Sequence, residues 1–259
     1  MTAPSETTAP AEPRRILVTG GAKGVGAAIV RTLAAGGYAV DFTYRSSGDA
    51  AAALARELAD AHGVAVNARA LDLSDTAAIE TFCTAHEDTS YYGLVHNAGQ
   101  SYDALTAVMS QDKAEAAMQV NFWSVTRLVK TFIRPMIRAR SGRVAVIGSV
   151  TALQANAGNA AYAASKGALL SYLRTLAIES AKRGVTANYI APGFIDTDMM
   201  TPYAAYRPQM EKQIPAGRFA APDEIAGLVA FLMSPPAAYI TGAVIPIDGG
   251  LTAQLGVHR

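Results

Sequence analysis

A glycine-rich turn between an apolar run and an alanine-rich segment constrains the fold of this chain more than any other feature. Residues 16–18 are typical of a buried strand, and residues 27–35 favour a helix. Between them, Gly20, Gly24 and Gly26 let the backbone approach a ligand closely, although their GxxxGxG spacing differs from the commoner GxGxxG. The N–H groups and positive dipole at a helix start attract phosphate, so the segment predicts a pyrophosphate cradle rather than a plain turn.

The alternation of strand and helix continues along the chain, with no linker that would separate two domains. Further strands are predicted at residues 38–47, 64–71, 92–96, 143–149, 185–190 and 244–247. Further helices are predicted at residues 50–62, 76–86, 113–120, 121–138 and 225–233, and around Tyr162. This pattern predicts an α/β fold, a single doubly wound parallel sheet of Rossmann-like type with helices on both faces.

We assign residues 14–251 to that domain, residues 1–13 to a flexible N-terminal tail and residues 252–259 to a C-terminal tail. Hydrophobic residues make up 51% of the 259 residues, which is ample for a large core, and the net charge of +1 gives no reason to expect nucleic acid. The single cysteine, Cys83, and four scattered histidines predict no disulfide and no metal site. The longest apolar run, residues 225–233, is about half a membrane span, so we expect a soluble, cytoplasmic protein.

Polar and glycine residues follow the predicted strands where a parallel sheet binds its ligands, outside the carboxyl ends. The residues at those ends are Gly20, Arg45, Asp72, Asn97, Ser149 and Pro192.

The end of the second strand favours NADPH over NADH. An acidic residue there would hold the ribose of NAD, but the sequence reads Tyr44-Arg45-Ser46, and Asp41 lies too early in the strand. A cation beside hydroxyl groups suits a 2′-phosphate, and Lys23 in the glycine turn adds a second positive charge. The alternative is that both basic residues are only solvated surface groups.

Tyr162 and Lys166 lie four residues apart, so on a helix their side chains share one face. A lysine beside a tyrosine favours the phenolate, which would lower the phenol pKa from about 10 toward the working range. With Ser149 at a strand end, they predict a site that protonates a carbonyl oxygen while its carbon is reduced. A packed tyrosine with a solvated lysine is the alternative, and the residues at the other strand ends favour catalysis.

These motifs resemble the classical short-chain dehydrogenases/reductases over about residues 15–251. The family's TGxxxGxG matches residues 19–26, and its NAG motif matches residues 97–99. The family's catalytic residues fall on Asn121, Ser149, Tyr162 and Lys166. The resemblance implies that the tyrosine donates a proton, the serine orients the carbonyl, the lysine also holds the nicotinamide ribose, and the asparagine anchors a relay water.

The resemblance also implies the cofactor contacts. They are Thr19, Gly20, Lys23, Gly24, Val25, Gly26, Tyr44, Arg45, Ser46, Asp72, Leu73, Asn97, Ala98, Gly99, Tyr162, Lys166, Pro192, Gly193, Ile195 and Thr197. Asp72 is expected to meet the adenine. His96 departs from the asparagine that many members carry before NAG, and we expect it to alter packing more than chemistry.

Within the family, residues 147–169, 190–199, 214–234 and 237–250 are most similar to bacterial 3-oxoacyl-acyl-carrier-protein reductases. This likeness implies NADPH-dependent reduction of a 3-oxoacyl thioester on an acyl carrier protein, in fatty-acid, polyketide or polyene biosynthesis. It also implies that Arg140 and Arg183, near the mouth of the cleft, dock the carrier, although basic residues are common at helix ends. The alternatives are a small-molecule alcohol dehydrogenase or carbonyl reductase, and a non-catalytic cofactor-sensing module.

The resemblance further implies a homotetramer. The helix at residues 121–138 and the helix after Tyr162 carry more apolar residues than one sheet face is expected to cover. The stretch at residues 239–251 ends in an edge strand that a partner could shield. The substrate wall is expected at residues 100–106 and 151–159 and in a lid at residues 194–213, with Tyr203, Tyr206 and Met210 as candidates to line an apolar pocket.

Overall fold

The computed structural model describes residues 13–254, and its centre is a parallel sheet of seven strands in the order β3-β2-β1-β4-β5-β6-β7. The strands are β1 (Arg15–Thr19), β2 (Ala39–Tyr44), β3 (Val66–Ala70), β4 (Tyr91–His96), β5 (Gly142–Ile147), β6 (Val185–Pro192) and β7 (Val244–Ile247). Chain order reverses direction between β1 and β4, the position at which such sheets bind ligands. The predicted fold class is confirmed.

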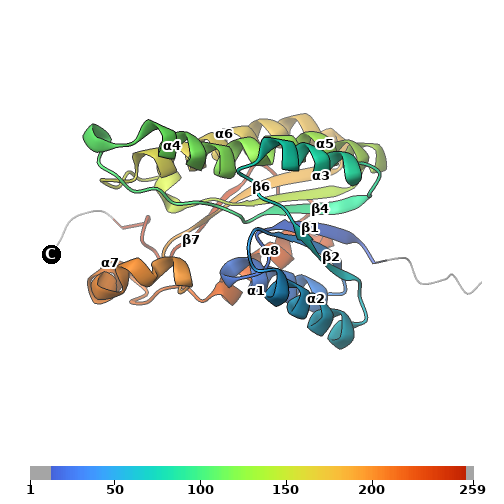
Figure 1. The fold of residues 1–259 in the computed structure, drawn as a ribbon, viewed down its shortest axis with the longest axis horizontal. Coiled ribbons are helices and arrows are strands. Elements are labelled where there is room, and N and C mark those ends of the chain that lie inside the picture. The colour runs from blue at the N-terminus through green and yellow to red at the C-terminus, as the bar shows by residue number, and fades with distance from the viewer. Residues whose placement is uncertain (1–12, 255–259) are drawn as a thin grey trace, which may run out of the picture.

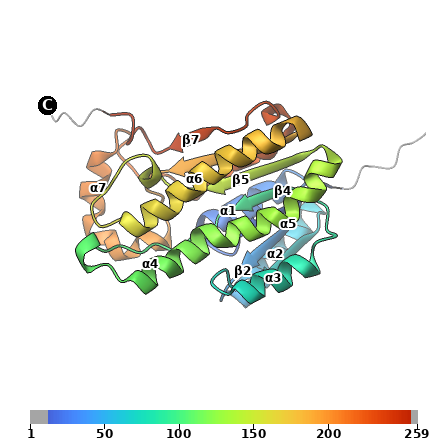
Figure 2. The ribbon, with the colours of Figure 1, turned by 90° about the horizontal axis from the view of Figure 1, so that it is seen from above.

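Helices cover both faces of the sheet (Figure 1; Figure 2). One face carries α3 (Thr76–Ala85), α4 (Gln111–Met118), α5 (Ser124–Ala139) and α6 (Ala160–Ser180). The other carries α1 (Gly24–Ala35), α2 (Gly48–His62) and α8 (Pro222–Met233), while α7 (Arg207–Gln213) lies beyond the end of the sheet. Short 3₁₀ segments lie at Thr106–Val108, Val150–Ala152, Ala181–Arg183, Asp198–Tyr206 and Pro235–Ala237.

Helix starts follow the local sequence signals. The Asp75 carboxylate caps α3 by accepting bonds from the N–H groups of Ala77 (2.8 Å) and Ala78 (3.1 Å). Pro222 opens α8, and the Glu224 carboxylate in its first turn accepts a 2.8 Å bond from the N–H of Ala221. Asp223 and Glu224 thus lie in the first turn, where the helix dipole favours negative charge.

The helices predicted at residues 113–120 and 121–138 are joined rather than separate. A π-helical turn at Gln119–Trp123 connects α4 to α5. Such turns are rare and often occur at functional sites, because the extra residue re-aims a side chain. Here the turn carries Asn121, which is fully buried between the helices and the sheet.

Most apolar residues of α5 and α6 are covered within the chain itself. Val125, Leu128 and Phe132 of α5 and Leu169 and Leu173 of α6 are buried in the core of this face. Part of the apolar surface of the two helices stays uncovered by the sheet, because Leu170 is only partly buried and Ile178 is 81% exposed. The homotetramer stays a prediction.

The domain makes contacts beyond its predicted C-terminal boundary. The Thr252 hydroxyl donates to the carboxylate that follows β7 (2.6 Å), and the Gln254 amide donates to the last residue of α7 (2.8 Å). The rest of the expected tail, residues 255–259, and the N-terminal tail up to residue 12 lie outside the described residues. Between residues 13 and 254, no helix is long and apolar enough to cross a membrane.

Candidate active site

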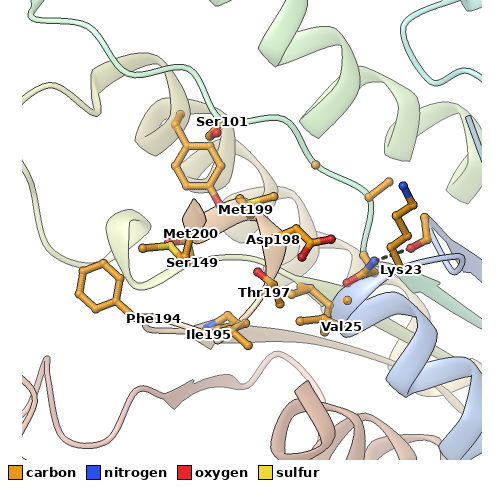
Figure 3. A pocket seen from close by; sticks show the side chains of 18 of the residues that line it. Lys23, Val25, Ser101, Ser149, Phe194, Ile195, Thr197, Asp198, Met199 and Met200 are labelled. Atoms are coloured by element: carbon orange, nitrogen blue, oxygen red, sulfur yellow. Dashed lines mark hydrogen bonds between the residues drawn. The ribbon is translucent and has the colours of Figure 1, made fainter. Parts of the chain in front are cut away.

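A cavity of about 860 Å³ opens at the carboxyl ends of β1, β4, β5 and β6. Figure 3 shows Lys23 and Val25 on its glycine-turn side and Phe194, Met199 and Met200 on the side of Ser149. The predicted site residues that line it are Gly20, Lys23, Gly24, Val25, Tyr44, Arg45, Ser46, Asn97, Ala98, Gly99, Ser149, Tyr162, Lys166, Pro192, Gly193, Ile195 and Thr197.

The glycine turn is held by the end of β4. The Asn97 side-chain amide donates to the carbonyls of Gly20 (3.0 Å) and Thr19 (3.3 Å), and the Thr19 hydroxyl accepts bonds from the N–H groups of Asn97 and Ala98. A Cβ at Gly26 would lie 2.0 Å from the carbonyl oxygen of Gly20, so only glycine fits there. The predicted contacts Thr19 and Gly26 therefore shape the turn from behind the cavity wall.

The start of α1 fits a phosphate. The helix begins at Gly24, and its N-cap residue, Lys23, makes no side-chain capping bond. First-turn N–H groups thus stay available to an anion, beside the exposed cations Lys23 and Arg45 that line the same cavity. A pyrophosphate with an additional phosphate on its ribose matches this arrangement.

Asp41 points away from the cavity, as expected. Its carboxylate is buried and accepts bonds from Arg15 (2.9 Å), Asn67 (2.8 Å) and Tyr91 (2.8 Å). The position at which NAD-binding sheets hold a ribose hydroxyl is therefore occupied by Tyr44, Arg45 and Ser46, which line the cavity.

Asp72 and Leu73 do not line the cavity. The Asp72 carboxylate accepts bonds from the hydroxyl (2.7 Å) and the N–H (2.9 Å) of Ser74, and these bonds lower its pKa. Leu73 is a buried core residue. The predicted adenine contact of Asp72 stays a prediction.

His96 lies fully buried behind the cavity wall. Its Nδ1 is 2.9 Å from the Thr19 hydroxyl, which already accepts two N–H bonds and therefore donates to the imidazole. Burial and then the charge of Lys166 lower the His96 pKa to about 3, so the ring stays neutral at physiological pH.

Tyr162 and Lys166 share the first turns of α6, as their spacing predicts. Lys166 is buried, its ammonium donates to the carbonyl of Ile147 at the end of β5 (3.0 Å), and it lies 5.6 Å from the centre of the Tyr162 ring. Ser149 follows the same strand, and its Oγ accepts bonds from the N–H (3.1 Å) and hydroxyl (2.9 Å) of Thr151. The hydrogen of the serine hydroxyl can therefore be donated to the Tyr162 phenol or to a ligand.

Burial dominates the protonation of this pair. It raises the pKa of Tyr162 to about 12, although a hydrogen bond with Ser149 partly opposes the rise. It lowers the pKa of Lys166 to about 8. The expected lowering of the tyrosine pKa by the lysine is not seen in this structure, because loss of hydration dominates. The phenol is thus a proton donor at neutral pH.

Asn121 joins the loop after β4 to α6. Its Oδ1 accepts from the N–H of Gln100 (2.7 Å), and its amide nitrogen donates to the Gln100 carbonyl (2.9 Å) and the Ser165 hydroxyl (2.9 Å). Both amide hydrogens are used, so they are not free to hold the relay water that the resemblance implies.

Comparisons with known proteins agree with this geometry. A family model described as enoyl-(acyl carrier protein) reductase matches residues 20–252. The chain is 40% identical to 3-oxoacyl-acyl-carrier-protein reductase FabG of Escherichia coli, over 91% of this chain and 96% of the relative. The solved short-chain dehydrogenase/reductase of Serratia marcescens is 36% identical with a TM-score of 0.87, covering 94% of this chain and 100% of that one.

The chain belongs to the short-chain dehydrogenase/reductase family. This makes it a member of an oxidoreductase family. A further similar structure is a blue fluorescent protein from a metagenomic library in complex with NADPH, 35% identical with a TM-score of 0.85, over 93% of this chain and 98% of that one.

The lid of this short-chain dehydrogenase/reductase folds as the 3₁₀ segment Asp198–Tyr206 followed by α7. Tyr203 and Met210 line the cavity as predicted. Tyr206 does not, because its side chain points to solvent and is 62% exposed. Asp103 also lines the cavity, within the substrate wall expected at residues 100–106. The sequence does not single out this residue, because a lone acidic residue between motifs carries no local signal.

Arg140 and Arg183 do not border the cleft of their own chain. Arg140 precedes β5 and Arg183 precedes β6, so both lie at the amino ends of strands whose carboxyl ends form the cavity. An Arg140 guanidinium nitrogen donates to the carbonyl of Lys182 (3.0 Å), which keeps these basic residues together at that far edge. Arg140 and Arg183 therefore do not lie near the cleft mouth of this chain, contrary to expectation, because the amino and carboxyl ends of parallel strands are separated by the length of a strand.

Proposed function

We propose that this protein is an NADPH-dependent reductase of 3-oxoacyl thioesters, with Ser149, Tyr162 and Lys166 as its catalytic residues and Asn121 as a positioning residue. The observation that carries the proposal is a tyrosine beside a serine and a buried lysine, at the end of β5 and in the cleft that contains the phosphate cradle.

NADPH would lie between the glycine turn and the ends of β4 and β6. The N-terminus of α1 would hold the pyrophosphate, and Lys23 and Arg45 would hold the 2′-phosphate. The bound cofactor would supply the hydride. The NADPH complex of the metagenomic protein supports this choice.

The side chains of the chain would manage the proton. Tyr162 donates its proton to the oxygen of the carbonyl as negative charge develops there. Ser149, whose oxygen accepts from Thr151, donates its hydroxyl hydrogen to the same oxygen and so fixes the position of the carbonyl. Lys166, held by the Ile147 carbonyl, stabilises the negative charge that remains on the tyrosine after transfer.

Asn121 would act through position rather than contact. By binding both Gln100 and Ser165, it holds the loop after β4 against α6. The Ser165 hydroxyl in turn donates to the carbonyl of Tyr162 (2.7 Å), which fixes the first turn of the helix.

Two observations support an acyl thioester as substrate. The lid presents Met199, Met200 and Met210 to the cavity, and methionine adapts readily to apolar chains of different shape. The similar Escherichia coli protein is named a 3-oxoacyl-acyl-carrier-protein reductase. The carrier-bound thioester is therefore the proposed substrate, and a small ketone or alcohol is the alternative.

Reduced-nicotinamide oxidation with a panel of substrates tests the proposal. We expect fast oxidation of NADPH with 3-oxoacyl groups on acyl carrier protein, slower oxidation with the matching N-acetylcysteamine thioesters, and none without a ketone. Small ketones and sugars serve as the comparison set. Turnover of small ketones or alcohols without turnover of any thioester would assign the protein to the alternative.

A further inference from the structure

Both cations and carboxylates line the cleft. Among the described residues, its basic lining groups are Lys23 and Arg45 at the glycine-turn end and the buried Lys166. Its acidic lining groups are Asp103, in the loop after β4, and Asp196 and Asp198, in the lid. Of these three carboxylates, Asp103 is the one whose charge acts on Tyr162, the expected proton donor.

Asp103 is fixed at the junction of three segments. Its carboxylate accepts a hydrogen bond from the amide of Asn159, the residue that precedes α6, and another from the hydroxyl of Tyr203 in the lid. Asn159 lies three residues before Tyr162, so the carboxylate is held near the start of the helix that carries the tyrosine, and it lines the same cavity. Its charge acts on Tyr162, whose pKa it raises in addition to the larger effect of burial.

The described structure gives Asp103 no ion-pair partner. The ion pairs between residues 13 and 254 join other residues, and both neighbours of this carboxylate are neutral donors. Asp196 differs, because Arg207 holds both of its oxygens (2.8 and 2.9 Å). No cation among the described residues therefore pairs with the Asp103 carboxylate.

We propose that Asp103 selects the substrate class, by rejecting oxo acids with a free carboxylate near the reacting carbonyl and admitting uncharged esters and thioesters. This inference rests on the proposed function as a ketone reductase. Two like charges several ångströms apart near a protein surface repel strongly enough to change affinity roughly three- to thirtyfold, and salt weakens that effect.

Matched substrates test the assignment. The probes are 3-oxobutanoate and its methyl ester, which differ by one charge near the same ketone. We expect Asp103→Asn to raise kcat/KM for the acid by about three- to tenfold, mainly through KM, and to change the ester by less than about twofold. The ratio of kcat/KM for the ester to kcat/KM for the acid, called the ester-to-acid ratio, should therefore fall in the variant. We expect the same fall for the unmodified protein when ionic strength rises.

Tyr203→Phe is the matched control, because it removes one hydrogen bond and leaves the charge. Its ester-to-acid ratio should stay that of the unmodified protein. An unchanged ratio in Asp103→Asn, or a ratio that does not respond to salt in the unmodified protein, overturns the assignment. The salt series needs no variant, so it decides the matter even if Asp103→Asn folds poorly.

Binding separates this inference from the proposed function. Dissociation constants of the acid and the ester are measured by calorimetry on protein loaded with NADP⁺, where no reduction occurs. Weaker binding of the acid, relieved in Asp103→Asn, supports the inference even if no thioester is reduced. Equal binding of acid and ester refutes it even if thioesters are good substrates.

Discussion

The two ends of the cleft are built differently. At the glycine-turn end, the side chains of Asn97 and Thr19 make four hydrogen bonds with backbone groups of the facing segment, and Thr19 is fully buried. At the lid end, Met199 is 56% exposed, and the tie to the facing loop is a single hydrogen bond between Tyr203 and Asp103. The cofactor end is therefore fixed by the fold, whereas the substrate end can adapt.

Surface interactions hold the lid itself. Arg207 pairs with Asp196 and Glu211 and lies 4.6 Å from the centre of the Phe219 ring. Phe194 stacks on Phe219 with 5.4 Å between ring centres. Because exposed ion pairs contribute little to stability, sequence changes in the lid can alter substrate choice without disturbing the cofactor site.

The largest expected effect of a substitution belongs to the reacting groups themselves. Tyr162→Phe removes the proton donor and should lower kcat roughly 10²- to 10⁴-fold. The phenol is not expected to be a major cofactor contact, so NADPH affinity should stay within about twofold. Stopped-flow reduction and fluorescence titration measure the two quantities. Near-normal turnover would remove Tyr162 from the mechanism.

Gly26→Ala tests how rigid the glycine turn is. A Cβ there would lie 2.0 Å from the Gly20 carbonyl oxygen and 2.6 Å from the Asn97 amide nitrogen. We expect a loss of about 1–3 kcal/mol in the free energy of unfolding and a large loss of NADPH affinity. Gly227→Ala, on an exposed helix face with nothing within 4 Å, is the matched control. Unchanged stability and NADPH affinity in Gly26→Ala would show that the glycine-turn end is not rigid.

Arg45→Ala tests whether the cofactor end distinguishes phosphates. NADPH affinity should fall about ten- to a hundredfold, the usual cost of losing a charge-assisted contact, while NADH affinity stays nearly constant. Arg56→Ala, an exposed residue of α2 that does not line the cavity, should change neither. Equal losses for both cofactors would show that Arg45 supports the fold instead.

The buried lysine predicts opposite pH trends for activity and stability. Lys166 loses its proton as pH rises through about 8, so reductive kcat should fall about tenfold per pH unit above that value. Tyr162, with a pKa of about 12, stays protonated there. Since the folded pKa of Lys166 lies below its ordinary value of 10.5, the unfolded chain binds more protons between about pH 8 and 10. The contribution of Lys166 to the free energy of unfolding should therefore rise with pH in that window.

Urea unfolding across this pH range measures the second trend. Lys166→Met, which cannot titrate, should abolish the rise in stability. A kcat that stays constant to pH 10 would place the lysine outside the reaction.

The smallest effect is expected in the lid. Arg207→Gln breaks exposed ion pairs and should shift the melting temperature by less than about 2 °C. Kinetically, KM for long-chain thioesters should change by a few-fold, while NADPH affinity stays constant. A large loss of stability would show that the lid is as rigid as the glycine turn.

The sequence by itself determined the fold and the position of the reacting groups. Apolar strands buried on both faces, the glycines of the turn and the Tyr162–Lys166 spacing are local patterns, and a parallel sheet brings the carboxyl ends of neighbouring strands to one edge. The acidic first turn of α8 was predictable for the same reason, since helix capping depends only on neighbouring residues.

Only the tertiary structure decided what depends on burial and on distance through space. Burial, which no spacing encodes, raised the pKa of Tyr162 and lowered that of Lys166. The packing of α5 and α6 decided which of their apolar residues are buried and which, such as Ile178, stay exposed. The sheet placed Arg140 at the edge opposite the cleft, and the folded lid brought Tyr203 to Asp103, a hundred residues away in the chain.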